Sequence, residues 1–186
     1  MKYIGPDFCN ITTLLTDEEL LIQKTANEFV KKEFMPLVNE YYEKGSFPVD
    51  LIPKMGELGF FGATLPKKYG GSEISSTAYG LIMQELEKGD SGLRSVCSVQ
   101  GGLVMYPIFQ YGTEEQKDKW LPKLASGKAI GCFGLTESNH GSDPGGMTTK
   151  AVKDGDDWII NGSKMWITNG TIADVAVVWA KDEEGI

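Results

Sequence analysis

The feature that most constrains the fold of this chain is a change of hydrophobic pattern near Gly127. Before this point, apolar residues recur at the three- and four-residue spacing of amphipathic helices. After it, short apolar runs are separated by turn residues, as in strands. A chain of 186 residues is long enough for one helical domain and part of a second domain. The sequence therefore predicts an α+β fold, with a helical domain over residues 1–128 and the first strands of a β domain over residues 129–186.

Capping patterns mark the start of two of the expected helices. Residues 16–19 (TDEE) and 113–116 (TEEQ) each place a threonine three residues before a glutamate or glutamine, which is the pattern of a capping box. We expect the 95–111 helix, with its apolar composition, to be deeply buried, and its glycines to permit close backbone approach. The expected helices cover residues 16–36, 51–58, 78–87, 95–111 and 113–124.

The strongest turn signal in the second part of the chain is Asn161-Gly162, because both residues tolerate positive φ. We therefore expect a hairpin over residues 158–168 that turns at this pair. Further strands are expected over residues 130–136 and 174–180. The polar tip that ends the sequence leaves the last strand without a successor, so we expect a truncated chain. The alternative is a small, complete α+β protein.

Composition and charge exclude several classes of function. The net charge is −8, from 18 basic and 26 acidic residues that are interspersed, so no basic stripe offers itself to nucleic acid. The single histidine, His140, excludes multi-histidine metal sites and most histidine-based triads. The three cysteines are far apart in sequence, which favours a reduced setting. No targeting segment is seen, so a cytoplasmic location is expected. No apolar run reaches about 18 residues, so no membrane span is expected.

Residues 131–143 (GCFGLTESNHGSD) form the most unusual stretch of the sequence. Small residues, hydroxyls and backbone amides are concentrated here, and such a loop can approach a planar or phosphorylated ligand closely. The alternative is an ordinary surface loop between strands, which composition alone favours.

Several motifs, in order along the chain, change that balance. Residues 133–137 (FGLTE), followed by 141–143 (GSD), resemble the flavin-binding signature of the acyl-CoA dehydrogenase family. Residues 164–169 (KMWITN) resemble the second flavin segment of that family. Residues 111–116 (YGTEEQ) and 120–122 (WLP) resemble the helix that leads into its β domain. The resemblance covers nearly the whole chain, and several ordered motifs are far more specific than one glycine loop.

The resemblance implies a helical N-terminal domain, a β-barrel middle domain and a C-terminal helical bundle, the last of which is missing from this chain. It implies FAD bound between the β domain and the bundle, homotetrameric assembly, and electron transfer to an electron-transferring flavoprotein. In the family reaction an acyl-CoA thioester loses an α-proton to a glutamate and a β-hydride to FAD. That glutamate belongs to the C-terminal domain, so no catalytic residue is assigned here, and we expect the chain alone to be inactive.

The same resemblance assigns binding roles by position. The implied flavin contacts are Phe133, Leu135, Thr136, Trp166, Ile167 and Thr168. Main-chain amides in the first segment, with the Thr136 hydroxyl, are expected to bond the polar edge of the flavin. Trp166 is expected to cover the ring and Thr168 to donate near the nitrogen that accepts hydride, while Ser142 contacts the thioester arm. The alternative for Trp166 is a core aromatic of a hairpin. A shared strand face with Thr168, two residues on, favours the flavin role.

Residues 87–100 (EKGDSGLRSVCSVQ) resemble glutaryl-CoA dehydrogenases, in which an arginine at the position of Arg94 binds the distal carboxylate of the substrate. A guanidinium beside an apolar run is costly unless paired, and a dicarboxylate supplies a bidentate partner. The neighbours expected to orient or share this anion site are Glu87, Ser95 and Ser98. The alternative is a structural pair between Arg94 and either Glu87 or Asp90.

The resemblance therefore implies conversion of glutaryl-CoA to crotonyl-CoA and CO₂. The open alternatives are a short-chain monocarboxylic acyl-CoA dehydrogenase, a non-decarboxylating glutaryl-CoA enzyme, a non-catalytic flavin or acyl-CoA binding module, and a structural or interaction protein. Arg94 argues against a plain monocarboxylic acyl chain. Flavin absorbance separates the structural protein from the others.

Overall fold

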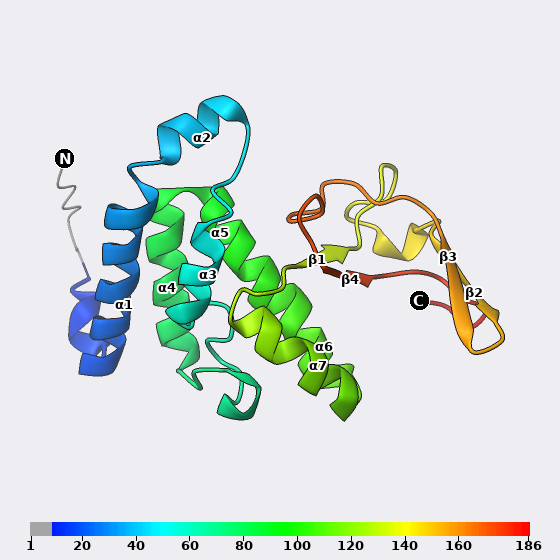
Figure 1. The fold of residues 1–186 in the computed structure, drawn as a ribbon, viewed down its shortest axis with the longest axis horizontal. Coiled ribbons are helices and arrows are strands. Elements are labelled where there is room, and N and C mark those ends of the chain that lie inside the picture. Colours follow the sequence, from blue (N-terminus) through cyan, green and yellow to red (C-terminus); the bar gives the residue numbers. More distant parts are fainter. Residues whose placement is uncertain (1–8) are drawn as a thin grey trace. The chain divides into compact units, whose positions relative to one another are not determined.

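The computed structural model describes residues 9–186, in which a series of helices is followed by short strands (Figure 1). The chain divides into two compact units. The first unit contains the described residues up to Leu51 together with Ile74–Arg94. The second contains Ile52–Glu73 and Ser95–Ile186, so each unit is built from two separate stretches of sequence.

The first unit is helical and is organised around the packing of α1 against α4. Its elements are η1 (Ile11–Leu14), α1 (Asp17–Phe29), the π-helical turn η2 (Val30–Phe34), α2 (Val38–Lys44), α4 (Ser76–Gly89) and the first turn of α5 (Ser91–Ser98). The buried Glu85 on α4 accepts hydrogen bonds from Gln23 (3.1 Å) and Asn27 (2.7 Å) on α1. This polar contact fixes the register of two helices whose other buried residues are apolar.

The second unit begins with helices and ends with strands. Its helical elements are α3 (Leu51–Glu57), η3 (Lys67–Tyr69), the π-helical segment η4 (Val99–Met105), α6 (Tyr106–Tyr111) and α7 (Glu114–Ala125). The helices expected from the sequence are confirmed. Both capping boxes are present: Thr16 exchanges hydrogen bonds with Glu19, and Thr113 with Gln116.

The helical run from α5 to α6 is only partly buried, so the expectation of a deeply buried helix is wrong. Val104 and Met105 are fully buried, but Leu103 and Tyr106 are 41% and 51% exposed. The run is therefore amphipathic. Gly101 does permit close approach, since a Cβ there would lie 2.5 Å from the Phe61 carbonyl oxygen. A π-helical insertion at this point accommodates the contact.

Two short sheets complete the second unit. β1 (Gly131–Gly134) pairs in parallel with β4 (Val175–Val178), and β2 (Lys150–Asp154) pairs antiparallel with β3 (Asp157–Asn161). The buried Gln100 joins η4 to β1, because its Oε1 accepts from the Gly131 N–H at 2.8 Å. Its Nε2 donates to the carbonyls of Leu124 and Ala129. The strands expected over residues 130–136 and 174–180 are confirmed.

The expected hairpin at Asn161-Gly162 is wrong. The observed hairpin turns at Gly155, whose φ is +62°, and joins β2 to β3. Gly162 serves a different purpose: a Cβ there would lie 2.3 Å from the Thr149 hydroxyl oxygen, so only glycine fits against that side chain. The following residues, 163–168, pair with no strand and instead run alongside the end of β1. Among the described residues, no helix is both long and apolar enough to cross a membrane.

Candidate functional site

The end of β1 presents backbone donors next to half-buried side chains. Leu135 and Thr136 follow the last ladder pair, Gly134 with Val178. Their carbonyl oxygens are occupied: Leu135 accepts from Lys164 Nζ at 3.1 Å and Thr136 from the Met165 N–H at 2.8 Å. Their own N–H groups form no hydrogen bond to any other residue in the described part of the chain. A cradle of this kind suits the acceptor edge of a ligand.

Aromatic residues flank this cradle. Phe133 packs edge-to-face against Trp179, with ring centroids 6.1 Å apart. Trp166 is 86% exposed and has a φ of +61°, a left-handed conformation that is rare for a bulky residue. Such strain costs on the order of 1–3 kcal/mol and concentrates at functional sites. The strand-period argument that joined Trp166 to Thr168 is wrong, because this segment is not a strand.

Residues around Trp166 are held by contacts from several directions. Asn169, also at positive φ, donates from Nδ2 to the Gly131 carbonyl at 3.1 Å. Ile167 and Thr168 are half-buried, and Thr168 Oγ1 lies 3.4 Å from Ser95 Oγ. The structure thus brings both expected flavin segments together and adds Ser95 to them. Ser98 donates to the Ser95 carbonyl at 3.2 Å.

A buried ion pair, for which no role was expected, joins the two segments. Lys164 Nζ donates to Glu137 Oε1 at 2.9 Å, and the two side chains are 12% and 4% exposed. Glu137 also accepts from the N–H and hydroxyl groups of Thr148 and Thr149. The hydroxyls of Thr149 and Thr148, together with the Lys164 ammonium, hold the pKa of the Glu137 carboxyl well below its ordinary range.

The Glu137–Lys164 ion pair could have been predicted from the positions of the two residues in the motifs. Glu137 ends the FGLTE motif and Lys164 begins the KMWITN motif, so opposite charges border two segments expected to meet. Thr148 and Thr149 belong to no motif. Their contribution depends on the chain's path after β1 and has no local signature.

Arg94 and Glu87, in the first unit, form the structural pair that was left open as an alternative. Arg94 Nε donates to Glu87 Oε2 at 2.8 Å, with the side chains 37% and 47% exposed. The Ser91 hydroxyl donates to Glu87 Oε1 at 2.6 Å. The pKa of Glu87 is lowered, first by Ser91 and then by Arg94. The pair is partly exposed to solvent.

Ser142 is exposed in the loop that precedes η5 (Pro144–Gly146). The structure brings it into no hydrogen bond with the other expected site residues. Its proposed contact with a thioester arm remains a prediction from position alone.

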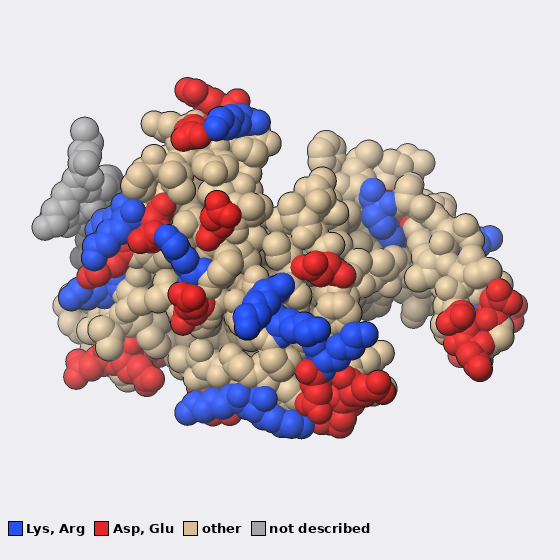
Figure 2. Space-filling model, in the orientation of Figure 1, with Lys and Arg blue, Asp and Glu red and all other residues tan. Residues whose placement is uncertain are grey.

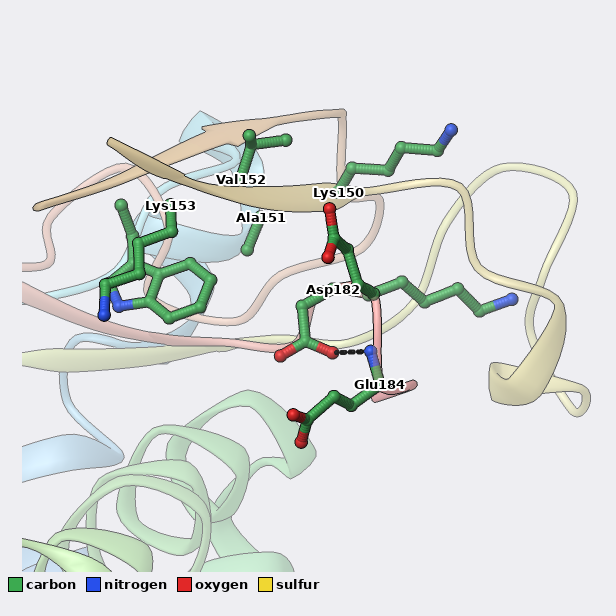
Figure 3. Close-up of a pocket in the computed structure, with 9 residues that line it drawn as sticks. Lys150, Ala151, Val152, Lys153, Asp182 and Glu184 are labelled. Carbon is green, nitrogen blue, oxygen red and sulfur yellow. Dashed lines mark hydrogen bonds between the residues drawn. The ribbon is translucent and has the colours of Figure 1, made fainter. Parts of the chain in front are cut away.

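A hollow of about 480 Å³ lies elsewhere in the second unit, between β2 and residues 181–184 (Figure 3). Lysines of β2 and acids of the terminal turn line it, and none of the expected site residues does so. Two of the lining residues are hydrogen-bonded to each other, since Asp182 accepts from the Glu184 N–H at 2.8 Å (Figure 3). In the space-filling view, basic and acidic groups are intermixed over much of the visible face (Figure 2).

The second unit therefore has backbone N–H groups at Leu135 and Thr136 beside the strained, exposed Trp166. The chain belongs to the acyl-CoA dehydrogenase family. The family description "Acyl-CoA dehydrogenase, N-terminal domain" matches residues 16–128, and "Acyl-CoA dehydrogenase, middle domain" matches residues 132–186. The resemblance inferred from the motifs is confirmed at this level, as is the fold class.

Individual relatives agree with this assignment. A probable acyl-CoA dehydrogenase of Bacillus subtilis is 43% identical over 92% of this chain and 46% of its own length. The human mitochondrial short-chain specific acyl-CoA dehydrogenase is 35% identical over 92% of this chain and 42% of its own length. The chain thus spans less than half the length of these relatives.

Among solved structures, glutaryl-CoA dehydrogenase from Mycobacterium smegmatis superimposes with a TM-score of 0.92 at 52% identity, covering 96% of this chain and 46% of that one. A second structure of a glutaryl-CoA dehydrogenase from this organism, in complex with FADH2, gives a TM-score of 0.92 at 50% identity and covers 95% and 45%.

Proposed function

We propose that this chain supplies the flavin-binding and acyl-binding half of an FAD-dependent acyl-CoA dehydrogenase. The observation that carries the proposal is that the Leu135 and Thr136 N–H groups have no acceptor within residues 9–186 and lie beside the exposed Trp166. These donors fit the oxygen and nitrogen acceptors along one edge of an isoalloxazine ring. The family assignment and the FADH2 held by a close structural relative support the same ligand.

Each flavin-segment residue then has a distinct task. Phe133, Leu135 and Ile167 supply apolar surface to the ring, and Trp166 covers it. The Thr136 hydroxyl adds a donor to the polar edge, and Thr168 donates near the reactive nitrogen. FAD, when bound, accepts the β-hydride as the thioester loses its α-proton.

The proposed substrate is glutaryl-CoA, with crotonyl-CoA and CO₂ as products. Arg94 is the only arginine of the chain, and its side chain is 37% exposed beside Glu87. A guanidinium offers a second carboxylate a paired set of donors, which an acyl chain without a distal charge does not need. Glu87 and Ser95 orient this anion site, Ser98 supports Ser95, and Ser142 meets the thioester arm.

A monocarboxylic short-chain substrate is the second candidate. The observation in its favour is that Glu87 already compensates the charge of Arg94 without any substrate carboxylate. A second carboxylate must then either join this pair or displace Glu87. The identity to a short-chain specific relative is in keeping with this alternative.

We further propose that residues 1–128 act as the helical domain and residues 129–186 as part of the β domain of a larger catalytic unit. No residue of this chain is assigned as catalytic base, so the 186-residue polypeptide alone is proposed to be inactive. An electron-transferring flavoprotein is the proposed electron acceptor, and a homotetramer the proposed assembly of the full-length enzyme.

The first test is FAD titration of the purified chain, followed by flavin absorbance. FAD binding is expected, and Trp166→Ala is expected to weaken it. Absence of FAD binding by the wild-type chain would contradict the flavin site.

The substrate is tested by calorimetry with glutaryl-CoA and butyryl-CoA. Arg94→Met should remove a preference for glutaryl-CoA, whereas the exposed-lysine control Lys44→Met should retain it. Turnover by the chain with FAD and an artificial acceptor contradicts the proposed inactivity.

A further inference from the structure

Lys164 connects the buried ion pair to the backbone cradle. Its Nζ donates to Glu137 Oε1 at 2.9 Å and to the Leu135 carbonyl at 3.1 Å. The Met147 sulfur lies 3.9 Å from the same nitrogen. The side chain is only 12% exposed, so water screens its charge weakly at this position.

Glu137 fixes where this cation sits. Its Oε2 accepts from the Thr148 N–H and hydroxyl, both at 2.7 Å. Its Oε1 accepts from the Thr149 N–H at 2.9 Å, from the Thr149 hydroxyl and from Lys164. Because both oxygens accept hydrogen bonds, the carboxylate is held in one orientation, which places Lys164 within reach of the Leu135 carbonyl.

The Leu135 carbonyl and the Thr136 N–H belong to one peptide group. A cation at the carbonyl oxygen draws electron density from that group and makes its N–H a stronger hydrogen-bond donor. The Thr136 N–H has no acceptor among the described residues. The effect of the lysine is thus available to a ligand placed against the cradle.

We propose that Lys164 is a positioning residue that polarises the Leu135–Thr136 peptide and thereby strengthens the Thr136 N–H toward the acceptor edge of a bound flavin. The inference rests on the proposed flavin site for its ligand, but the polarised peptide is a property of the ligand-free chain. A lysine that served only as a structural counter-ion for Glu137 would have no effect on the Thr136 amide. The two roles therefore differ in a measurable way.

The test is nuclear magnetic resonance of the labelled, ligand-free 186-residue chain. In Lys164→Met, the Leu135 carbonyl carbon and the Thr136 amide nitrogen are expected to move upfield. Lys164→Arg, which retains a charged donor, is expected to restore most of the wild-type shifts. Lys153→Met on β2 is the matched control, since it removes an exposed lysine of the same unit.

A second variant protects the test against misfolding. Lys164→Met leaves the Glu137 charge buried without its cation, which destabilises a fold. The double variant Glu137→Gln with Lys164→Met removes both charges and is expected to give the same upfield shifts. FAD titration completes the set: loss of one charge-assisted contribution is expected to weaken binding by about tenfold in both variants.

The outcomes separate this inference from the proposed function. Shifts no larger than those of Lys153→Met overturn the inference, whatever the chain does with FAD. Shifts with unchanged FAD affinity overturn it too, because the peptide then does not face the ligand. If Lys164→Met changes the chemical shifts as expected but the wild-type chain binds no FAD, the polarised peptide is supported and the flavin function is overturned.

Discussion

Ser95 Oγ lies 3.4 Å from Thr168 Oγ1, so a residue expected at the substrate carboxylate contacts a residue expected at the flavin. Either hydroxyl can donate in this pair. The hydroxyl that donates here cannot donate elsewhere with the same proton. The contact therefore links the orientation of Thr168 to the presence of Ser95.

We expect a measurable coupling between these hydroxyls. In a double-mutant cycle of Ser95→Ala and Thr168→Val, the coupling in the free energy of unfolding should be about 0.5–1 kcal/mol, as for a neutral hydrogen bond. Urea unfolding of the four proteins measures it. Strictly additive effects would show that the hydroxyls do not interact in solution.

Acid should destabilise the protein through Glu137. Its pKa is lowered in the folded state from the usual 4.5, chiefly by the Thr149 and Thr148 hydroxyls. The ionised form therefore stabilises the fold fully above pH 4.5, and this contribution is lost as the pH falls further. Glu137→Gln should be less stable than wild type at neutral pH, with a shallower loss of stability on acidification.

The comparison is made by urea unfolding between pH 7 and pH 3. Some acid sensitivity must remain in Glu137→Gln, because Lys68, Lys117 and Tyr69 lower the pKa of Glu114 to about 2. Identical pH slopes for the variant and the wild type would rule out a stabilising role for the Glu137 carboxylate.

Gly162→Ala should destabilise the second unit. A Cβ at this position would lie 2.3 Å from Thr149 Oγ1 and 2.7 Å from Thr149 Cα, which leaves no room without displacing that residue. Overpacking of this kind costs about 1–3 kcal/mol. Gly141→Ala is the matched control, because nothing lies within 4 Å of its Cβ position. Equal unfolding free energies for the two variants would contradict the close approach.

Gln100→Met should be among the most damaging single changes in the second unit. Gln100 is 1% exposed, and its amide satisfies Gly131, Leu124 and Ala129. Methionine fills similar space but leaves the Gly131 N–H and the Ala129 carbonyl without a partner, at a cost of at least about 2 kcal/mol; the Leu124 carbonyl still accepts from the Gly127 N–H. The exposed Gln110→Met should be nearly neutral. Thermal unfolding of both variants measures the difference. Similar unfolding midpoints would show that the Gln100 hydrogen bonds do not stabilise the second unit.

The helices were predictable because their signals are local. The capping boxes at Thr16 and Thr113 place donor and acceptor within one turn, and both form as expected. The hairpin was mispredicted for a non-local reason. Asn161-Gly162 has ideal turn chemistry, but Gly162 is needed where the chain crosses Thr149, and the turn forms at Gly155 instead.

The candidate site divides in the same way. Its two segments were predicted because each is a contiguous motif, and the structure brings them into contact. The left-handed conformation of Trp166 and the links from Glu137 to Thr148 and Thr149 were not found. These depend on how distant segments cross, which neither periodicity nor composition records.

The parallel pairing of β1 with β4 has a consequence for how the site forms in time. The Ile130 N–H donates to Asp174 Oδ2 across 44 residues of chain, and residues 164–168 lie inside the loop that this contact closes. Closing such a loop carries an entropic cost before any pairing compensates it, which makes non-local pairings slow to form. We therefore expect the cradle at Leu135 and its partner Lys164 to assemble late in folding. A ligand that binds them would select chains in which the ladder has already closed.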